Sequence, residues 1–328
     1  MKPLRISLAC TVTDRTRPIL ERRVLIKGCD PQPITGEPED IFARALRDEE
    51  FDVTELSLSS YLIVIGRRTS PYIAVPAFPS RAFRHSAVYV RTDRGIDRPE
   101  DLAGATVGVP EFQQTAALWV RGILADRHGV PPSAITWRSG GLERPGGEER
   151  IPVEVRDDID LRPIDANSTL SGMLSDGGLD ALVSPRPPSC FEAGHQEVRR
   201  LWPDHREEER RFYRDTGLFP IMHVVAVRRT LADHHPWLPR NVFRAFSEAK
   251  RDAIRDLEQT NFLRVTLPWI DLDEVRGSMG EDYWPYGVAA NQAELAAAIR
   301  WSVAEGLSPR DLDPDELFHP DAREEDER

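Results

Sequence analysis

The sequence predicts an α/β protein of two lobes, each a mixed sheet with flanking helices, joined by two crossing strands. Three observations support this fold class. Strand-like and helix-like stretches alternate over residues 4–78, which is typical of a parallel sheet covered by helices. Long apolar strands are expected at 85–91 and 221–227, far apart in the chain. The length of 328 residues suits two domains of roughly 150 residues each.

The first lobe is expected to begin with a strand over residues 4–10, where polar and apolar side chains alternate. A helix should follow from Asp40, whose carboxylate can cap the first turn. A second strand is predicted over 51–59, a short helix over 61–66, and a third strand over 72–78. These elements complete a βαβαβ unit.

The second lobe is expected to begin where the strand at 85–91 leaves this unit. Short buried strands are predicted at 106–110 and 180–184, with a helix after the first of them. The stretch 139–150 is rich in glycine, proline and charge, which predicts an exposed loop. The strand at 221–227 then returns the chain to the first lobe.

Helices are expected to dominate from Pro239 onward, including one that begins with a capping box at Asn291. We therefore assign residues 1–88 and 225–328 to a discontinuous first lobe, and 89–224 to an inserted second lobe. Ligands of open α/β sheets bind beyond the carboxyl ends of the strands. The cleft between the lobes is thus the expected ligand site.

Composition excludes several classes of function. Acidic residues outnumber basic ones, 55 to 43, so the basic face of a nucleic-acid-binding protein is not expected. Cys10, Cys29 and Cys190 form no CxxC pair, so neither a zinc knuckle nor a disulfide framework is predicted. No apolar run reaches the roughly 18 residues of a membrane span, and Met1–Cys10 lacks the apolar core of a signal peptide. We expect a cytoplasmic protein without nucleic-acid or membrane partners, and leave open whether it forms a homo-oligomer.

Four stretches have a recognisable order and spacing: ELSLSSYL (55–62), FPSRAFRHS (78–86), VGVPEFQQTA (107–116) and WPYG (284–287). From Leu4 to about Phe318, the chain resembles the 4,5-dihydroxyphthalate decarboxylase family. The resemblance implies a type II periplasmic-binding-protein-like fold, in agreement with the two-lobed prediction. It also implies a carboxy-lyase that removes CO₂ from an aromatic hydroxy-diacid, 4,5-dihydroxyphthalate, to give protocatechuate without an organic cofactor.

Such a reaction makes three demands on the protein. In 4,5-dihydroxyphthalate the 4-hydroxyl lies para to one carboxylate, so polarising it pushes electrons toward the ring carbon that bears this carboxylate. A general acid must protonate that carbon, and a base must lie near the phenol. Arginine side chains are suited to hold the carboxylate that stays on the ring.

His85 and His223 fall on the two expected crossing strands, below the predicted cleft. Either could handle the proton, because an imidazole titrates near neutral pH. The alternative for each is a histidine held inside the core. The other histidines fall at helix ends or in polar loops, where exposed side chains are expected.

Four arginines follow the carboxyl ends of strands. Arg81 and Arg84 come after the third strand, and Arg15 and Arg17 after the first. We expect Arg81 above all to hold the retained carboxylate, and Arg15 next. For Arg84 and Arg17 the alternative to substrate binding is an ion pair between lobe and hinge.

Hydroxyl and amide groups could bind the substrate from both lobes. Ser57 and Ser59 alternate outward from the second strand, and Ser59 is the better placed of the two for a ligand. Gln113, Gln114 and Thr115 open the helix of the second lobe, where backbone N–H groups can hold a carboxylate.

Two further assignments stay open. Trp284 could form a wall for an aromatic ring, although an aromatic cluster before a helix is more often core. Glu111 could act as an acid or base, or cap a helix. A divalent metal held by His85, His223 and Glu111 is an alternative without local HxH or HxxxH support.

Two rival functions remain at this stage. The first is the solute-binding protein of an ABC importer for an aromatic or sulfonate-like anion, which the missing signal peptide disfavours. The second is a decarboxylase or lyase acting on a different acid.

Overall fold

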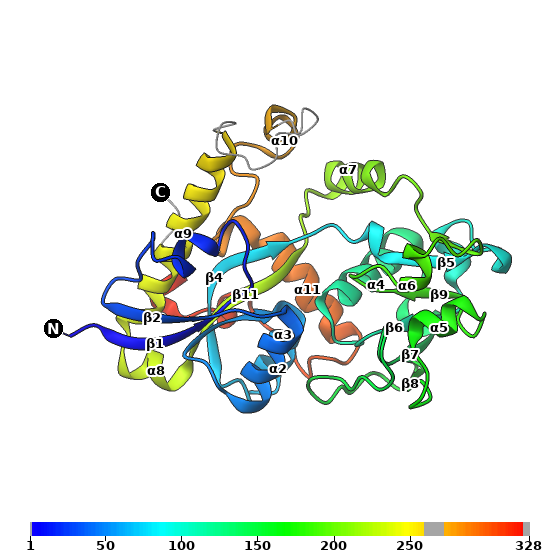
Figure 1. The fold of residues 1–328 in the computed structure, drawn as a ribbon, viewed down its shortest axis with the longest axis horizontal. Coiled ribbons are helices and arrows are strands. Elements are labelled where there is room, and N and C mark those ends of the chain that lie inside the picture. The colour runs from blue at the N-terminus through cyan, green and yellow to red at the C-terminus, as the bar shows by residue number, and fades with distance from the viewer. Residues whose placement is uncertain (1, 259–271, 324–328) are drawn as a thin grey trace.

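The computed structural model describes residues 2–258 and 272–323, and in them the chain forms two lobes, each built on one sheet (Figure 1). The first sheet has the strand order β2-β1-β3-β11-β4. Its strands are β1 (Leu4–Ala9), β2 (Cys29–Ile34), β3 (Val53–Ser57), β4 (Tyr72–Arg81) and β11 (Ile221–Arg228). β1 pairs in parallel with β2 and β3, whereas β11 runs antiparallel between β3 and β4. This mixed sheet agrees with the predicted α/β class.

The second sheet has the order β10-β5-β9-β6-β7-β8. Its strands are β5 (Val88–Arg91), β6 (Thr106–Val109), β7 (Thr136–Ser139), β8 (Leu161–Pro163), β9 (Ala181–Val183) and β10 (Val198–Arg200). β6 lies in parallel between β7 and β9, while β5 runs antiparallel to both of its neighbours. Each lobe thus has its own mixed sheet.

The two predicted crossing strands are not neighbours, and this corrects the hinge that we expected. β5 lies in the second sheet, while the whole of β11 lies in the first and pairs with β4. The lobes meet instead at the end of β4, where Arg81 lies opposite Ile221 and the Ala82 N–H donates to Pro220 O at 3.1 Å. A boundary between residues 224 and 225 therefore cuts through β11.

Proline explains why the sequence misplaced this hinge. β4 extends to Arg81, beyond the predicted end at Phe78, although it contains Pro76 and Pro79. Both prolines fall between Val75 and Ser80, where shifts in the β4–β11 register leave residues without one-to-one partners. A residue that cannot donate a ladder hydrogen bond is tolerated at such an irregularity.

Strand β2 was also missed, for a related reason. Its sequence, CDPQPI, holds two prolines and has no alternating pattern. It lies at the edge of the first sheet, where proline is tolerated because one side of the strand needs no partner.

Helices cover both sheets. In the first lobe they are α1 (Arg17–Leu20), α2 (Pro38–Asp48), α3 (Leu58–Gly66), α8 (Arg229–His234), α9 (Trp237–Glu258), α10 (Leu272–Met279) and α12 (Pro320–Arg323). α2 begins at Pro38, with Glu37 as its N-cap, rather than at the expected cap Asp40. Proline suits the first helical position because the N–H it lacks has no partner there. No described helix is both long and apolar enough to cross a membrane.

The helices of the second lobe are α4 (Thr115–His128), α5 (Leu170–Ser175), α6 (Ser189–Glu192) and α7 (His205–Thr216). α4 is buried over its first ten residues and lies beside α11 (Gln292–Ala304), which comes from the C-terminal part of the chain (Figure 1). The rings of Trp119 and Trp301 meet at 4.9 Å between these two helices. The C-terminal segment therefore ties the first lobe to the second.

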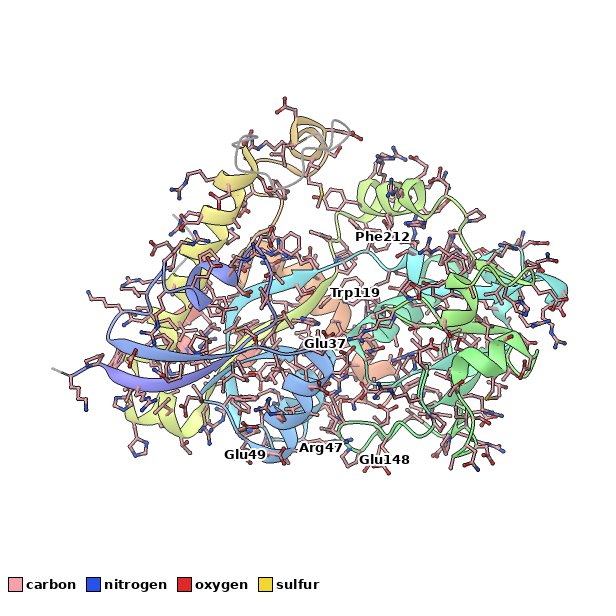
Figure 2. The ribbon with its side chains drawn as sticks, in the orientation of Figure 1. Glu37, Arg47, Glu49, Trp119, Glu148 and Phe212 are labelled. Atoms are coloured by element: carbon pink, nitrogen blue, oxygen red, sulfur yellow. The ribbon has the colours of Figure 1, made fainter. Side chains whose placement is uncertain are left out.

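Polar contacts also join the lobes along the edge below α2. Figure 2 shows Arg47 of α2 beside the loop that carries Glu148. Arg47 donates to the carbonyl oxygens of Arg150 and Glu149, at 3.1 and 3.3 Å. The predicted loop 139–150 thus leaves the second sheet and returns against the first lobe.

Candidate active site

A cavity of about 230 Å³ lies between the lobes, where β3 ends and β11 begins. Phe42, Ser57 and His223 line it from the first lobe, and Thr115 and Ala116 from the N-terminus of α4. Three arginines complete its wall: Arg84, Arg150 and Arg186. This is the inter-lobe position at which the sequence predicted a ligand site.

His223 forms the centre of this cavity's polar network. It lies on β11 opposite Ser57 of β3, and its Nδ1 is 2.5 Å from Glu55 Oε1. Its ring also meets the edge of Phe42, with 4.8 Å between the ring centres. Glu55 is fully buried, and its other oxygen accepts hydrogen bonds from the N–H and the hydroxyl of Thr11, at 2.8 and 2.6 Å.

Glu55 keeps a negative charge inside the protein. Burial raises the pKa of its carboxyl, but the hydrogen bonds from His223 and Thr11 and the charge of the imidazole outweigh this effect. The pKa of Glu55 therefore lies below its ordinary value.

Arg84 supplies a cation that has donors to spare. The one hydrogen bond found for its guanidinium within residues 2–258 and 272–323 runs from Nε to the sulfur of Met222, at 3.1 Å. A thioether is a weak acceptor. Burial lowers the pKa of Arg84 to about 10, against the opposing charge of Glu209, so the side chain remains charged at neutral pH.

Arg150 and Arg186 bring two more positive charges to the wall. Arg150 pairs with Glu111, yet its Nη1 is buried without a hydrogen-bond partner. Arg186 spans the cleft to Glu37 and Glu39, at 2.9 and 2.7 Å. Glu39 also lines the cavity, so its affinity for an anion depends mainly on Arg84, which forms no ion pair among the described residues.

Hydroxyl groups join the lobes at the base of the cavity. Ser57 Oγ lies 2.8 Å from Thr115 Oγ1, which also accepts the Ser59 N–H at 3.0 Å. Ser60 Oγ donates to Gln113 Oε1 at 2.9 Å. Gln114, the N-cap of α4, lines the cavity and holds a buried side-chain oxygen without a hydrogen-bond partner.

The structure places Arg81 away from the cavity. Its side chain is fully buried, and its Nη1 and Nη2 donate to the carbonyl oxygens of Phe219 and Pro285, at 2.7 and 2.9 Å. It also bonds Asn291 and lies 3.7 Å from Glu294. Arg81 Nε is buried there without a hydrogen-bond partner, and the side chain does not line the cavity.

His85 also lies outside the cavity. It packs against Trp202 and Phe212, with ring centres 5.0 and 5.4 Å away, beside a separate cavity of about 330 Å³. Burial, followed by the nearby charges of His128 and other basic groups, lowers the pKa of His85 to about 4. Its surroundings are those of the core histidine that we considered as the alternative.

Arg15 and Trp284 form a cluster against β4. Arg15 stacks over the ring of Trp284 at 3.7 Å and donates to Pro79 O, while Trp284 donates to Phe78 O. Arg17 opens α1. None of Arg15, Arg17 and Trp284 lines the cavity of His223.

The three residues considered for a metal site have different surroundings. His223 is bonded to Glu55, His85 lies among aromatic rings, and Glu111 is paired with Arg150. Across the described ranges, no group of three His, Cys, Asp or Glu side chains is arranged to hold a metal ion.

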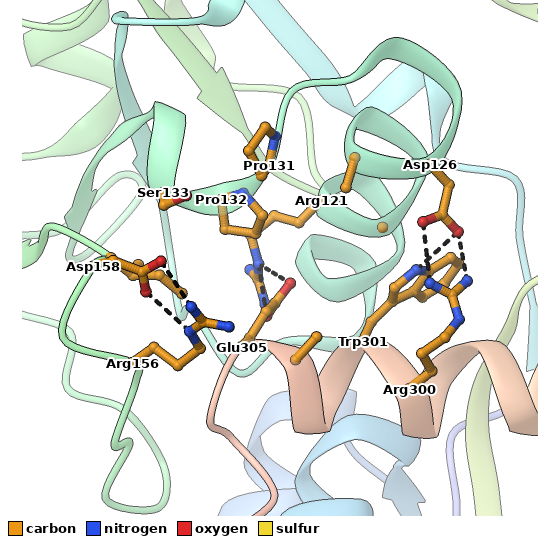
Figure 3. A pocket seen from close by; sticks show the side chains of 14 residues that line it. Arg121, Asp126, Pro131, Pro132, Ser133, Arg156, Asp158, Arg300, Trp301 and Glu305 are labelled. Carbon is orange, nitrogen blue, oxygen red and sulfur yellow. Dashed lines mark hydrogen bonds and ion pairs between the residues drawn. The ribbon is translucent and has the colours of Figure 1, made fainter.

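A cavity of about 310 Å³ on the other side of α4 differs in its charges (Figure 3). Its charged side chains are paired with one another: Arg121 with Glu305, Arg156 with Asp158, and Arg300 with Asp126.

A further cavity, of about 800 Å³, adjoins the cavity of His223 and shares Glu39, Gln114 and Arg186 with it. The loop 139–150 lines this larger space, which offers a route to the site.

Sequence reasoning missed Glu55, Phe42, Arg150 and Arg186. Glu55 did give a signal, because an acid at the centre of an otherwise buried strand needs a partner. The two arginines gave none, since each lies in a loop whose path depends on the tertiary fold.

Comparisons with known proteins agree with this geometry. A 4,5-dihydroxyphthalate decarboxylase of Comamonas testosteroni is 46% identical over 322 residues, which cover 98% of each chain. One of Pseudomonas putida is 46% identical over 214 residues, 65% of this chain and 83% of that protein. No family model matches the sequence.

Solved structures resemble the fold at lower identity. A putative periplasmic sulfonate-binding protein of Methylobacillus flagellatus has a TM-score of 0.57 at 13% identity, covering 98% of this chain and 93% of that one. The aliphatic sulphonate-binding protein of Escherichia coli has a TM-score of 0.55 at 14% identity, covering 98% and 99%. These likenesses confirm the predicted two-lobed binding-protein fold. The sequence identity goes further, and shows that this chain belongs to the 4,5-dihydroxyphthalate decarboxylase family.

Proposed function

We propose that this protein releases CO₂ from 4,5-dihydroxyphthalate, the compound in the names of its relatives, and forms protocatechuate. The observation that carries the proposal is the His223–Glu55 pair in an arginine-lined cavity between the lobes. A proton donor and several cations are what an aromatic diacid needs in order to lose one carboxylate.

The cations bind and orient the substrate. Arg84 and Arg150 have unused donors at the cavity, and the first N–H groups of α4 add a second anion-binding element. Charge-assisted hydrogen bonds to arginine hold a carboxylate in a fixed plane. In this arrangement Arg84, rather than Arg81, holds the carboxylate that remains on the ring.

His223 then acts as the general acid. The 4-hydroxyl gives its proton to water in the cleft and regains it after CO₂ has left. Electrons from the resulting phenolate move through the ring to the carbon that bears the departing carboxylate, and His223 Nε2 gives its proton to that carbon. The bond to the carboxylate breaks, its electron pair restores the aromatic ring, and CO₂ leaves. Neutral His223 regains a proton from water before the next turnover.

The experiment that tests this function combines turnover and binding. Purified protein is incubated with 4,5-dihydroxyphthalate, and CO₂ and protocatechuate are measured together. Equal amounts of both products are expected without an added organic cofactor. Tight binding of the diacid without any CO₂ would instead indicate a solute-binding protein. Activity that disappears on chelation and returns only with a divalent ion would indicate a metal-dependent reaction.

A further inference from the structure

Glu55 is an uncommon residue for the inside of a sheet. A buried carboxylate is costly unless each oxygen finds a donor. Thr11 supplies two donors to Oε2, and His223 Nδ1 meets Oε1 at 2.5 Å. In the part of the chain that the structure describes, no lysine or arginine forms an ion pair with Glu55. The group that meets its Oε1 is therefore the imidazole of His223.

The three residues come from neighbouring strands of the first sheet. Thr11 follows β1, Glu55 lies in β3, and His223 lies in β11. β3 pairs with both of the other strands, so the sheet itself sets the spacing of the three side chains. This chain of hydrogen bonds runs from the core of the first lobe to the wall of the cavity.

The arrangement leaves one ring nitrogen for the substrate. A carboxylate only accepts hydrogen bonds, so His223 Nδ1 must carry a proton. Nε2 is then the nitrogen that can exchange a proton with a ligand in the cavity. Because Nδ1 stays protonated in both the charged and the neutral imidazole, the ring needs no rotation between turnovers. The edge contact with Phe42 further restricts the ring.

We propose that Glu55, anchored by Thr11, is a positioning residue that holds His223 in the tautomer and orientation needed to protonate the substrate. This inference rests on the proposed decarboxylase function. Glu55 does not touch the substrate and acts only through His223. Thr11 keeps the carboxylate from rotating, so that Oε1 remains directed at Nδ1.

Glu55→Gln is the most direct test. The amide has one oxygen, and it stays toward Thr11 because the Thr11 backbone N–H can only donate; the NH₂ group therefore faces His223 Nδ1, which must then accept. We expect kcat to fall about 10- to 100-fold while KM changes about threefold or less, because substrate contacts remain. Two-bond ¹H–¹⁵N spectra of histidine-labelled protein should show His223 leaving the Nδ1–H form, with His223→Asn used to assign the signal.

Thr11 provides a matched pair that leaves Glu55 in place. Thr11→Val removes the hydroxyl donor at nearly constant volume and should lower kcat about threefold to tenfold. Thr11→Ser keeps the hydroxyl and should restore kcat to within about twofold of the wild type. This pair tests the inference even if Glu55→Gln fails to fold.

Two outcomes overturn the inference. One is a folded Glu55→Gln protein with wild-type kcat and an unchanged His223 tautomer. The other is Thr11→Val and Thr11→Ser with equal kcat. Failure of the proposed function looks different, because the wild type itself would then release no CO₂ while its His223 spectrum still showed the Nδ1–H tautomer.

Discussion

The cleft and the hinge of this protein use the same residue types in opposite ways. At the hinge, Arg81 and His85 are enclosed by carbonyl oxygens and aromatic rings. In the cleft, Arg84 has spare donors, and His223 keeps one nitrogen for the cavity. The difference teaches that access to the cavity, rather than residue type or place in a motif, separates the two pairs, since Arg84 and His223 line the cavity and Arg81 and His85 do not. Four predictions test this contrast.

The largest effect is expected at a buried ion pair. Arg121 and Glu305 form a bidentate pair at 2.6 Å between α4 and the end of α11. Glu305→Gln should lower the free energy of unfolding by about 3–5 kcal/mol, since it leaves a buried charge unpaired. Urea denaturation measures the change. Glu208→Gln, which breaks an exposed pair with Arg211, is the control and should cost less than about 1 kcal/mol. Equal losses of unfolding free energy in Glu305→Gln and Glu208→Gln would contradict this difference between buried and exposed pairs.

The two histidines should separate activity from stability. His223→Asn should lower kcat about 100-fold or more, because the general acid is lost. His85→Asn should instead lower the melting temperature, with activity that follows the folded fraction. Steady-state kinetics and thermal unfolding on both variants decide the assignment. If both retain near-wild-type kcat, the proton comes from another group, and Glu111 is the next to examine.

Substitutions of Arg84 and Arg81 should likewise distinguish an effect on activity from an effect on stability. Arg84→Lys keeps the charge but loses the planar fork, and should lower kcat/KM about 10- to 100-fold. Arg81→Lys cannot reach Phe219 O, Pro285 O and Asn291 together, so it should mainly lower the melting temperature. A folded Arg81→Lys protein with a 100-fold loss of kcat/KM would return the carboxylate clamp to Arg81.

The most gradual effect is a pH dependence of stability. The pKa of His85 is about 4 in the folded protein, below its value near 6.5 in an unfolded chain. The unfolded state therefore binds the proton first as the pH falls. Stability from the neutral ring is complete above pH ~6.5 and declines toward pH ~4, by at most about 1.4 kcal/mol per pH unit. Urea titrations should show a shallower decline for His85→Asn than for the wild type, and parallel curves would contradict the assignment.

Much of the fold could be predicted because it follows from local patterns. Alternating apolar residues located β1, apolar runs located β9 and β11, and residues 113–115 marked the start of α4. β2 and the end of β4 could not be predicted in this way. Their prolines break the pattern, and only the sheet edge and the register shift make them acceptable.

The site was predictable only in part. The cavity contains His223, Ser57, Gln114 and Thr115, all named from the sequence, because strand ends and helix starts meet at such clefts. The choice between Arg81 and Arg84 lay beyond sequence reasoning. The oxygens that occupy Arg81 come from residues more than 130 positions away in the chain.

The contact between α4 and α11 has a consequence for how the protein admits and releases molecules. A wide rigid-body opening of the lobes would pull Trp119 from Trp301 and separate Arg121 from Glu305. On the opposite rim, Arg186 holds Glu37 and Glu39 through pairs that solvent reaches easily and that cost little to break. The contacts at the rim near loop 139–150 are thus easier to break than those between α4 and α11. We expect the lobes to separate first at that rim. If the substrate and products exchange through this rim alone, the His223–Glu55 pair stays in place while they do so.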